Sequence, residues 1–184
     1  PGTDWIEDLV LRQAGPDVYD EWVKNEVSFE SPEIKAAFDS VGEILLNPAY
    51  VNAGLGEGDV ATINATAFGD VAIPVADGTC PMTHQASFFD GFITDAGAEV
   101  GPDADVWAFI TPGVEEGAPA VTGGGENVGA FTDDADVQKV QEYLSSAEWA
   151  NSRVELGGVI SANSGLDPES ASSPILQEAI KILQ

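Results

Sequence analysis

Apolar residues recur at three- and four-residue spacing between Ser31 and Asn47, in the most regular pattern that the chain contains. Ser31 can cap a helix, and Pro32 suits its first turn because that position needs no backbone N–H. Asn47-Pro48 ends the pattern, since the residue before a proline disfavours the helical conformation. We therefore expect one amphipathic helix whose apolar face carries Ile34, Ala37, Phe38, Val41, Ile44 and Leu45.

Further helices are predicted on both sides of this one. Thr3 or Asp4 can cap a first helix that runs to about Arg12, and Gly15-Pro16 separates it from a short helix at residues 17–23. A later helix opens at the capping residues 132–134 and carries apolar residues as far as Leu144. The remaining predicted helices lie at residues 61–76, 147–156 and 175–183.

Short apolar stretches between the helices are typical of buried strands. Residues 105–111 are rich in Val, Trp, Phe and Ile and stop at Pro112-Gly113, and residues 79–89 have the pattern of another strand. After a Pro/Gly connector, apolar residues return at 119–131 around three consecutive glycines. Helices that alternate with short strands predict an α/β fold.

The charge of the chain narrows the range of ligands. Six Lys and Arg residues against 32 Asp and Glu residues give a net charge of −26. Such a surface repels nucleic-acid backbones, anionic membranes and anionic substrates, and its simplest role is to keep the protein soluble. No apolar run is long enough to span a bilayer, and neither a signal peptide nor an initiating Met is present.

Few residues suggest metal or covalent chemistry. Cys80 is the single cysteine and His84 the single histidine, so a zinc site lacks ligands and no disulfide can form within the chain. In an extended segment these two side chains stand too far apart for a Cys–His nucleophile. Paired carboxylates are everywhere in so acidic a chain and indicate nothing by themselves. We expect no metal and no cofactor.

Two features indicate a ligand rather than a core. Trp5 lies beside Asp4, and an aromatic ring next to a carboxylate is how proteins hold a sugar. Gly123-Gly124-Gly125 is either a bend in a strand or a place where the backbone approaches a ligand, with Glu126 or Asn127 supplying polar contacts. Core packing is the favoured role of the other three tryptophans, Trp22, Trp107 and Trp149.

Four segments together resemble a known family, and they follow one another across nearly the whole chain. They read PGTDWIEDLVLR with VYDEWVKNEVSFESPEIKAAF, TCPMTHQASF, VTGGGENVGAFTDDADVQKVQEYLSSAEWA, and LGGVISANSGLD. In these segments the chain resembles the extracellular solute-binding proteins (family 1) of ABC sugar importers, most closely the α-glucoside/oligosaccharide-binding group. None of the segments is a catalytic signature, so their order carries the resemblance.

The resemblance implies a type II periplasmic-binding-protein fold with two α/β lobes, of which this chain would be an incomplete copy. Residues 1–112 would form most of the second lobe and residues 113–118 the crossing. Residues 119–184 would form the returning part of the first lobe and the final helix. The chain begins abruptly and ends inside an apparent helix, as a piece of a longer protein would.

The resemblance also implies a site, a function and partners. The ligand-binding residues would be Asp4, Trp5, His84, Gln85, Phe88, Gly124, Gly125, Glu126 and Asn127. The protein would bind a neutral oligosaccharide and deliver it to ABC permease subunits, without enzymatic chemistry. It would be extracellular, as a lipid-anchored cell-surface protein or in a periplasm. Two alternatives stay open: a secreted acidic glycosidase domain, and a cell-surface structural or adhesion module.

Overall fold

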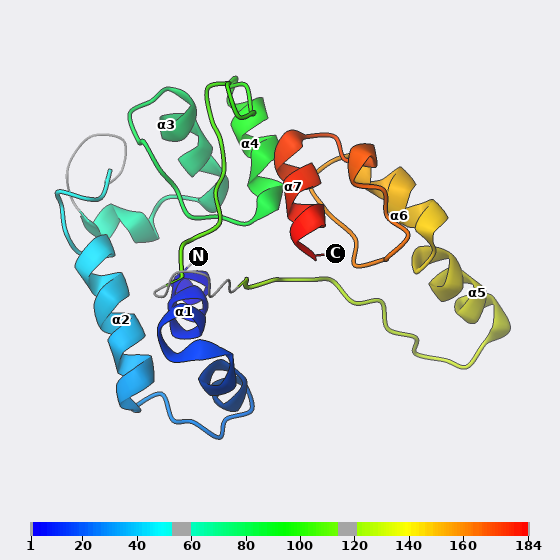
Figure 1. Cartoon of the computed structure of the whole chain (residues 1–184), viewed down its shortest axis with the longest axis horizontal. Helices are drawn as coiled ribbons and strands as arrows, with labels where there is room; N and C mark the ends of the chain where they lie inside the picture. Colours follow the sequence, from blue (N-terminus) through cyan, green and yellow to red (C-terminus); the bar gives the residue numbers. More distant parts are fainter. Residues whose placement is uncertain (1, 53–59, 114–120, 184) are drawn as a thin grey trace. The chain divides into compact units, whose positions relative to one another are not determined.

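The structure is a computed structural model that describes residues 2–52, 60–113 and 121–183. Over these ranges the chain is helical, and the helices are joined by long irregular segments (Figure 1). The α-helices are α1 (Gly2–Val23), α2 (Pro32–Leu45), α3 (Ala72–Ala76), α4 (Asp90–Asp95), α5 (Ala135–Leu144), α6 (Ala147–Val154) and α7 (Pro174–Leu183). The 3-10 helices are η1 (Val60–Asn64), η2 (Phe68–Val71), η3 (Ser87–Phe89) and η4 (Pro168–Ser170).

Helix α1 is two helices joined at a kink, as the sequence predicts. Gly15 has φ 85° and ψ 170°, which no helix accommodates and which glycine adopts without steric cost. Pro16 follows it and supplies the fixed φ of a new first turn. The first part carries the buried residues Ile6, Asp8, Val10 and Leu11.

Helix α2 confirms the helix predicted from the apolar spacing, but two residues of its predicted apolar face, Phe38 and Ile44, are exposed. Its N-cap is Ser31, whose Oγ accepts a hydrogen bond from the Ile34 amide at 3.4 Å. The helix buries Ile34, Ala37 and Val41 against α1, and these residues form one apolar cluster with Ile6 and Val10. Half-buried Trp22 packs against this cluster, which agrees with its predicted core role.

The chain divides into two compact units, each assembled from two separate stretches of sequence. Unit 1 comprises residues 1–70 and 109–124, and unit 2 comprises residues 71–108 and 125–184. The backbone therefore passes from one unit to the other three times. Each unit has its own core, and each is described here by itself.

Unit 2 contains two apolar clusters. One joins α6, the segments on either side of η4, and α7 through Ala150, Val154, Leu166, Ala171, Leu176 and Ile180. The other surrounds α3 and α4 and consists of Ala72, Phe89, Ile93 and Ala98. Between α4 and α7, the hydroxyl of Ser173 donates a hydrogen bond to the buried carboxylate of Asp90. This contact connects residues that are 83 positions apart in the sequence.

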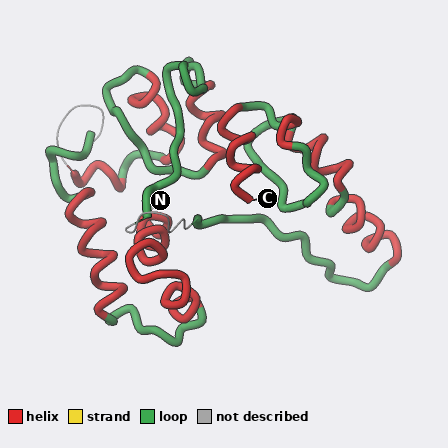
Figure 2. Tube along the Cα trace, viewed as in Figure 1, coloured by secondary structure: helices red, strands yellow, loops and turns green. Residues whose placement is uncertain are grey.

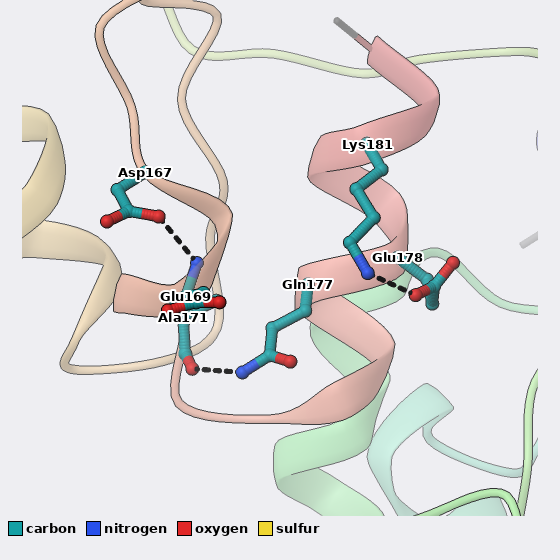
Figure 3. Close-up of polar contacts among 6 residues, drawn as sticks. All are labelled: Asp167, Glu169, Ala171, Gln177, Glu178 and Lys181. Carbon is teal, nitrogen blue, oxygen red and sulfur yellow. Dashed lines mark hydrogen bonds and ion pairs between the residues drawn. The ribbon is translucent and has the colours of Figure 1, made fainter.

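Polar contacts hold the segment that leads into α7 (Figure 3). The Glu169 amide donates to Asp167 Oδ1 at 3.0 Å, and Gln177 Nε2 donates to the Ala171 carbonyl at 3.3 Å. On the exposed side of α7, Lys181 Nζ lies 2.7 Å from Glu178 Oε1. The side-chain bond from Gln177 thus connects α7 to Ala171, the residue that follows η4.

The predicted α/β fold is wrong for the residues that the structure describes. Figure 2 shows helices and loops over these ranges but no strand, and their β pairing is limited to an isolated bridge between Val100 and Val106. A strand is stabilised by hydrogen bonds to a neighbouring strand and by cross-strand side-chain pairs. Residues 107–113 and 121–133 make no backbone–backbone hydrogen bonds within the described ranges. The predicted type II periplasmic-binding-protein architecture, which is an α/β architecture, is therefore also wrong for the described residues.

The exposure of their apolar side chains explains why these segments form no strand. Phe109 and Phe131 are 71% and 99% exposed, although both lie in stretches with the composition of a strand. Trp107 is also 39% exposed, so its predicted core role is wrong. β-propensity measures how well a residue packs on a pleated surface, and the described residues offer these side chains no such surface.

Other predictions differ in detail. Residues 79–89 form no strand; they run through a turn into η3, and α4 follows where no helix was predicted. Most of the predicted crossing at 113–118 lies outside the described residues. Within the described ranges, no helix combines the length and the apolar character needed to cross a membrane. The predicted lobe boundaries stay a prediction.

Candidate functional site

Two of the predicted ligand residues lie in the first turn of α1. Asp4 is exposed, and its Oδ1 accepts a hydrogen bond from Thr3 Oγ1 at 3.3 Å. A carboxylate in the first turn is favoured by the positive end of the helix dipole. Trp5 is half-buried and packs against the apolar core of unit 1. This turn of α1 therefore presents a fixed aromatic ring next to an accessible carboxylate.

One turn further along, α1 carries a buried ion pair that the sequence analysis missed. Arg12 Nη2 and Nε lie 3.2 Å from Asp8 Oδ1 and Oδ2, and both side chains are only 4% exposed. Residues four apart lie on the same face of a helix, so this spacing in the sequence was the available signal. The two parallel N–H···O bonds give a bidentate geometry, which fixes the orientation of both groups.

The same carboxylate reaches the segment that leads into the glycine run. Thr122 Oγ1 donates a hydrogen bond to Asp8 Oδ1 at 3.3 Å, across 114 positions of sequence. Both residues belong to unit 1, which contains α1 and the second stretch at residues 109–124. Unit 1 thus holds Asp4, Trp5 and the start of the glycine run together.

The glycine run is open on its outer side. A Cβ atom added to Gly123, Gly124 or Gly125 would meet no atom within 4 Å, and none of the three has a positive φ. Neither a bend nor close packing therefore requires glycine in this structure. Glu126 and Asn127, which follow in unit 2, are exposed. The space beside the backbone is what a ligand that approaches it closely would need.

Three further predicted residues lie in the first stretch of unit 2, at residues 71–108. His84 and Gln85 are half-buried in the irregular segment before η3. Phe88 packs against the cluster around α3 and α4, and its ring meets that of Phe92 edge-on at 6.3 Å between centroids. The structure therefore brings His84, Gln85 and Phe88 into one short segment of unit 2.

Metal binding finds no support in the described ranges, where no three His, Cys, Asp or Glu side chains gather around a common point. Cys80 Sγ donates to the Met82 carbonyl at 3.2 Å. That contact orients the thiol within its own turn.

A hollow in unit 1 lies apart from the predicted residues. It has a volume of about 400 Å³ and is lined by Glu7, Tyr19, Trp22, Val23, Asn25 and Phe29. Tyr19 donates its hydroxyl proton to Glu7 Oε2 at 3.1 Å. The pKa of the Tyr19 phenol is raised, first by burial and then by its hydrogen bond to the Glu7 carboxylate and the charge of that group.

Comparison with known proteins gives two relatives. No protein-family profile matches the chain, and no solved structure matches it. The osmoprotective compounds-binding protein GgtB of Synechocystis sp. is 31% identical over 170 residues, which cover 90% of this chain and 38% of the relative. The alpha-glucosides-binding periplasmic protein AglE of Rhizobium meliloti is 37% identical over 107 residues, which cover 57% of this chain and 22% of the relative.

The chain therefore spans less than two fifths of the length of either relative. The first match nevertheless extends over nearly the whole chain, as the four sequence segments do. The resemblance stated from those segments is confirmed: the chain is a homologue of solute-binding proteins, and an α-glucoside-binding protein is among its relatives.

Proposed function

We propose that the protein is the substrate-binding component of an ABC carbohydrate importer, which binds a neutral oligosaccharide of the α-glucoside type and delivers it to a permease. The observation that carries this proposal is the 37% identity to a protein named for binding alpha-glucosides. The 31% identity to a second binding protein, over 90% of the chain, supports the same class of function. Both relatives are named for binding, so the proposed activity is reversible capture rather than catalysis.

The charge of the chain supports a neutral ligand. A net charge of −26 repels anionic solutes over several ångströms, whereas a neutral sugar experiences no such barrier. A sugar is held instead by hydrogen bonds to its hydroxyl groups and by aromatic rings that cover its C–H faces.

The proposed site combines these two kinds of contact. Asp4 and Glu126 accept hydrogen bonds from sugar hydroxyls, and Trp5 and Phe88 cover apolar faces. Further polar contacts come from His84, Gln85 and Asn127. The backbone at Gly124 and Gly125 approaches the ligand closely, for which the open space beside both glycines leaves room.

The proposed mechanism is capture followed by closure. A sugar that makes more contacts in the closed state than in the open state favours closure by its higher affinity for the closed state. The closed form then docks on the permease. The protein would act outside the cytoplasmic membrane, either lipid-anchored at the cell surface or in a periplasm.

Isothermal titration calorimetry of the protein expressed from its natural gene tests the proposal. The panel contains maltose, maltotriose and trehalose, with sucrose and glycine betaine as osmoprotective compounds and a set of amino acids and dipeptides as controls. We expect micromolar or tighter binding of at least one α-glucoside. Heat with amino acids or peptides alone would exclude a carbohydrate carrier, and turnover of an aryl glycoside would indicate the glycosidase alternative.

Gly124→Ala tests the site itself. The added methyl group meets no neighbouring atom in the protein, so the fold should be unaffected. A ligand in contact with the backbone would lose about tenfold in affinity, because it can no longer approach as closely. Gly129→Ala is the matched control, since Gly129 lies in the same extended segment with equally open surroundings. Equal affinities for both variants would remove Gly124 from the site.

A further inference from the structure

The buried Asp8–Arg12 pair stands between two parts of the proposed site. Asp4, Asp8 and Arg12 follow one another at four-residue spacing in the regular first part of α1, so they lie along one face of the helix. Asp8 also accepts the hydroxyl of Thr122, two residues before Gly124. One carboxylate therefore connects the helix turn that bears Asp4 to the segment that bears the glycines.

The segment that contains Thr122 has few other restraints in the described part of the chain. Residues 121–124 make no backbone–backbone hydrogen bond there, and the space beside Gly123 and Gly124 is open. Neither a β-ladder nor close packing fixes the backbone at this point. The hydroxyl bond from Thr122 is the contact that the structure shows between this segment and a rigid element.

Asp8 is suited to holding that segment because its own position is fixed. Arg12 binds both carboxylate oxygens, and the pair is almost fully buried, so the carboxylate cannot rotate without breaking two charge-assisted hydrogen bonds. A buried ion pair is weak support for stability by itself, since apolar residues of similar volume often serve as well. In this protein the pair instead provides a hydrogen-bond acceptor, the Asp8 carboxylate, whose position and orientation are fixed.

We propose that Asp8, oriented by Arg12, is a positioning residue for the ligand site: it holds Thr122 and thereby sets the place of the Gly123–Gly124 backbone relative to Asp4 and Trp5. This inference rests on the proposed function for the presence of a ligand at these residues. It adds three residues that do not contact the ligand and that control how well the contacting groups are placed. A displacement of about 1 Å in the residues that support the contacting groups is enough to weaken ligand binding.

Thr122→Val tests the inference, because valine has nearly the same shape as threonine and lacks the donor. With the sugar that the calorimetric panel identifies, we expect about tenfold weaker binding by Thr122→Val. Thr122→Ser keeps the hydroxyl and should restore affinity to within about threefold of the unaltered protein. Thr132→Val, at an exposed threonine outside the site, is the matched control and should bind as the unaltered protein does.

A second measurement needs no ligand. Nitrogen-15 relaxation of the Gly123 and Gly124 amides should give order parameters of about 0.85 in the unaltered protein and in Thr122→Ser, and below about 0.6 in Thr122→Val. Equal order parameters in the unaltered protein and Thr122→Val would overturn the positioning role, as would equal dissociation constants. Absence of binding to every sugar by the unaltered protein would instead remove the proposed function and leave the relaxation data to decide whether Asp8 holds the segment.

Discussion

Within the described residues each unit of the molecule buries one aspartate, and the two aspartates are stabilised in different ways. Asp8 of unit 1 faces the guanidinium of Arg12 on its own helix, so its charge is neutralised locally. Asp90 of unit 2 instead accepts from the Gly91 amide at 2.7 Å and from the distant Ser173 hydroxyl. Both carboxylates accept a hydroxyl from a distant residue, Thr122 in unit 1 and Ser173 in unit 2. They differ in the local partner, which is a guanidinium for Asp8 and a backbone amide for Asp90.

The largest effect is expected from Arg12→Leu. This change leaves the Asp8 carboxylate buried without its cation, which should lower the free energy of unfolding by about 3–5 kcal/mol. Urea unfolding followed by circular dichroism measures the loss. The double variant Asp8→Leu/Arg12→Leu is the control and should recover most of it, because a buried apolar pair carries no desolvation cost. A single variant as stable as the unaltered protein would show that the carboxylate is solvated in solution.

Ser173→Ala should have the next largest effect. It removes a hydroxyl donor from the buried Asp90 carboxylate, and with it the acceptor for the Leu176 amide at the start of α7. We expect a loss of about 2–3 kcal/mol in the free energy of unfolding. Ser173→Thr keeps both hydrogen bonds and should lose much less. Equal losses in the two variants would assign the effect to packing rather than to the hydroxyl.

Two glycines, one in each unit, differ in the space available for a Cβ atom beside the backbone. A Cβ atom on Gly165 of unit 2 would lie 2.8 Å from the Ala147 Cβ, whereas one on Gly124 of unit 1 meets nothing. Gly165→Ala should therefore cost about 1–2 kcal/mol through overpacking. Gly124→Ala should change the free energy of unfolding by less than about 0.5 kcal/mol. Thermal unfolding of both variants under one set of conditions gives the difference, and a Gly124→Ala loss as large as that of Gly165→Ala would contradict the open surroundings.

The smallest effect concerns Tyr19. Its pKa is raised above the ordinary value of 10.0, chiefly by burial, so the folded state retains the phenolic proton more strongly than the unfolded state does. The resulting stabilisation is fully present below about pH 10 and is lost as the pH rises through the folded pKa. Tyr19→Phe should remove this pH dependence. Absorbance at the tyrosinate band follows the titration, and a Tyr19 titration at the ordinary value would refute the burial of the phenol.

Much of the helical structure could be predicted because its signals are local. The cap at Ser31, the proline at Pro32 and the apolar spacing lie within one segment, and so does the Gly15 break in α1. The strand predictions failed because a strand exists only with a partner, which composition does not reveal. Phe109 and Phe131 carry strand propensity in segments that pair with nothing among the described residues.

The residues of the candidate site also differ in whether a local sequence pattern reveals them. The Asp8–Arg12 pair was readable from four-residue spacing, whereas Thr122 lies 114 positions away and no pattern in the sequence connects it to Asp8. Helix α4 was missed because its six residues, DGFITD, are too few to establish a period. The relationship to solute-binding proteins was readable because it rests on the order of whole segments, which 31% identity over 170 residues bears out.

The interleaved course of the backbone limits how the protein can be divided. A protease that cuts after Asp70 breaks the chain between residues 1–70 and residues 109–124, which belong to the same unit. Because each unit consists of two separate stretches of sequence, no single cleavage separates either unit as an intact piece. A gene encoding unit 1 alone would have to splice residue 70 to residue 109, and limited proteolysis should yield nicked molecules whose fragments co-elute rather than separate.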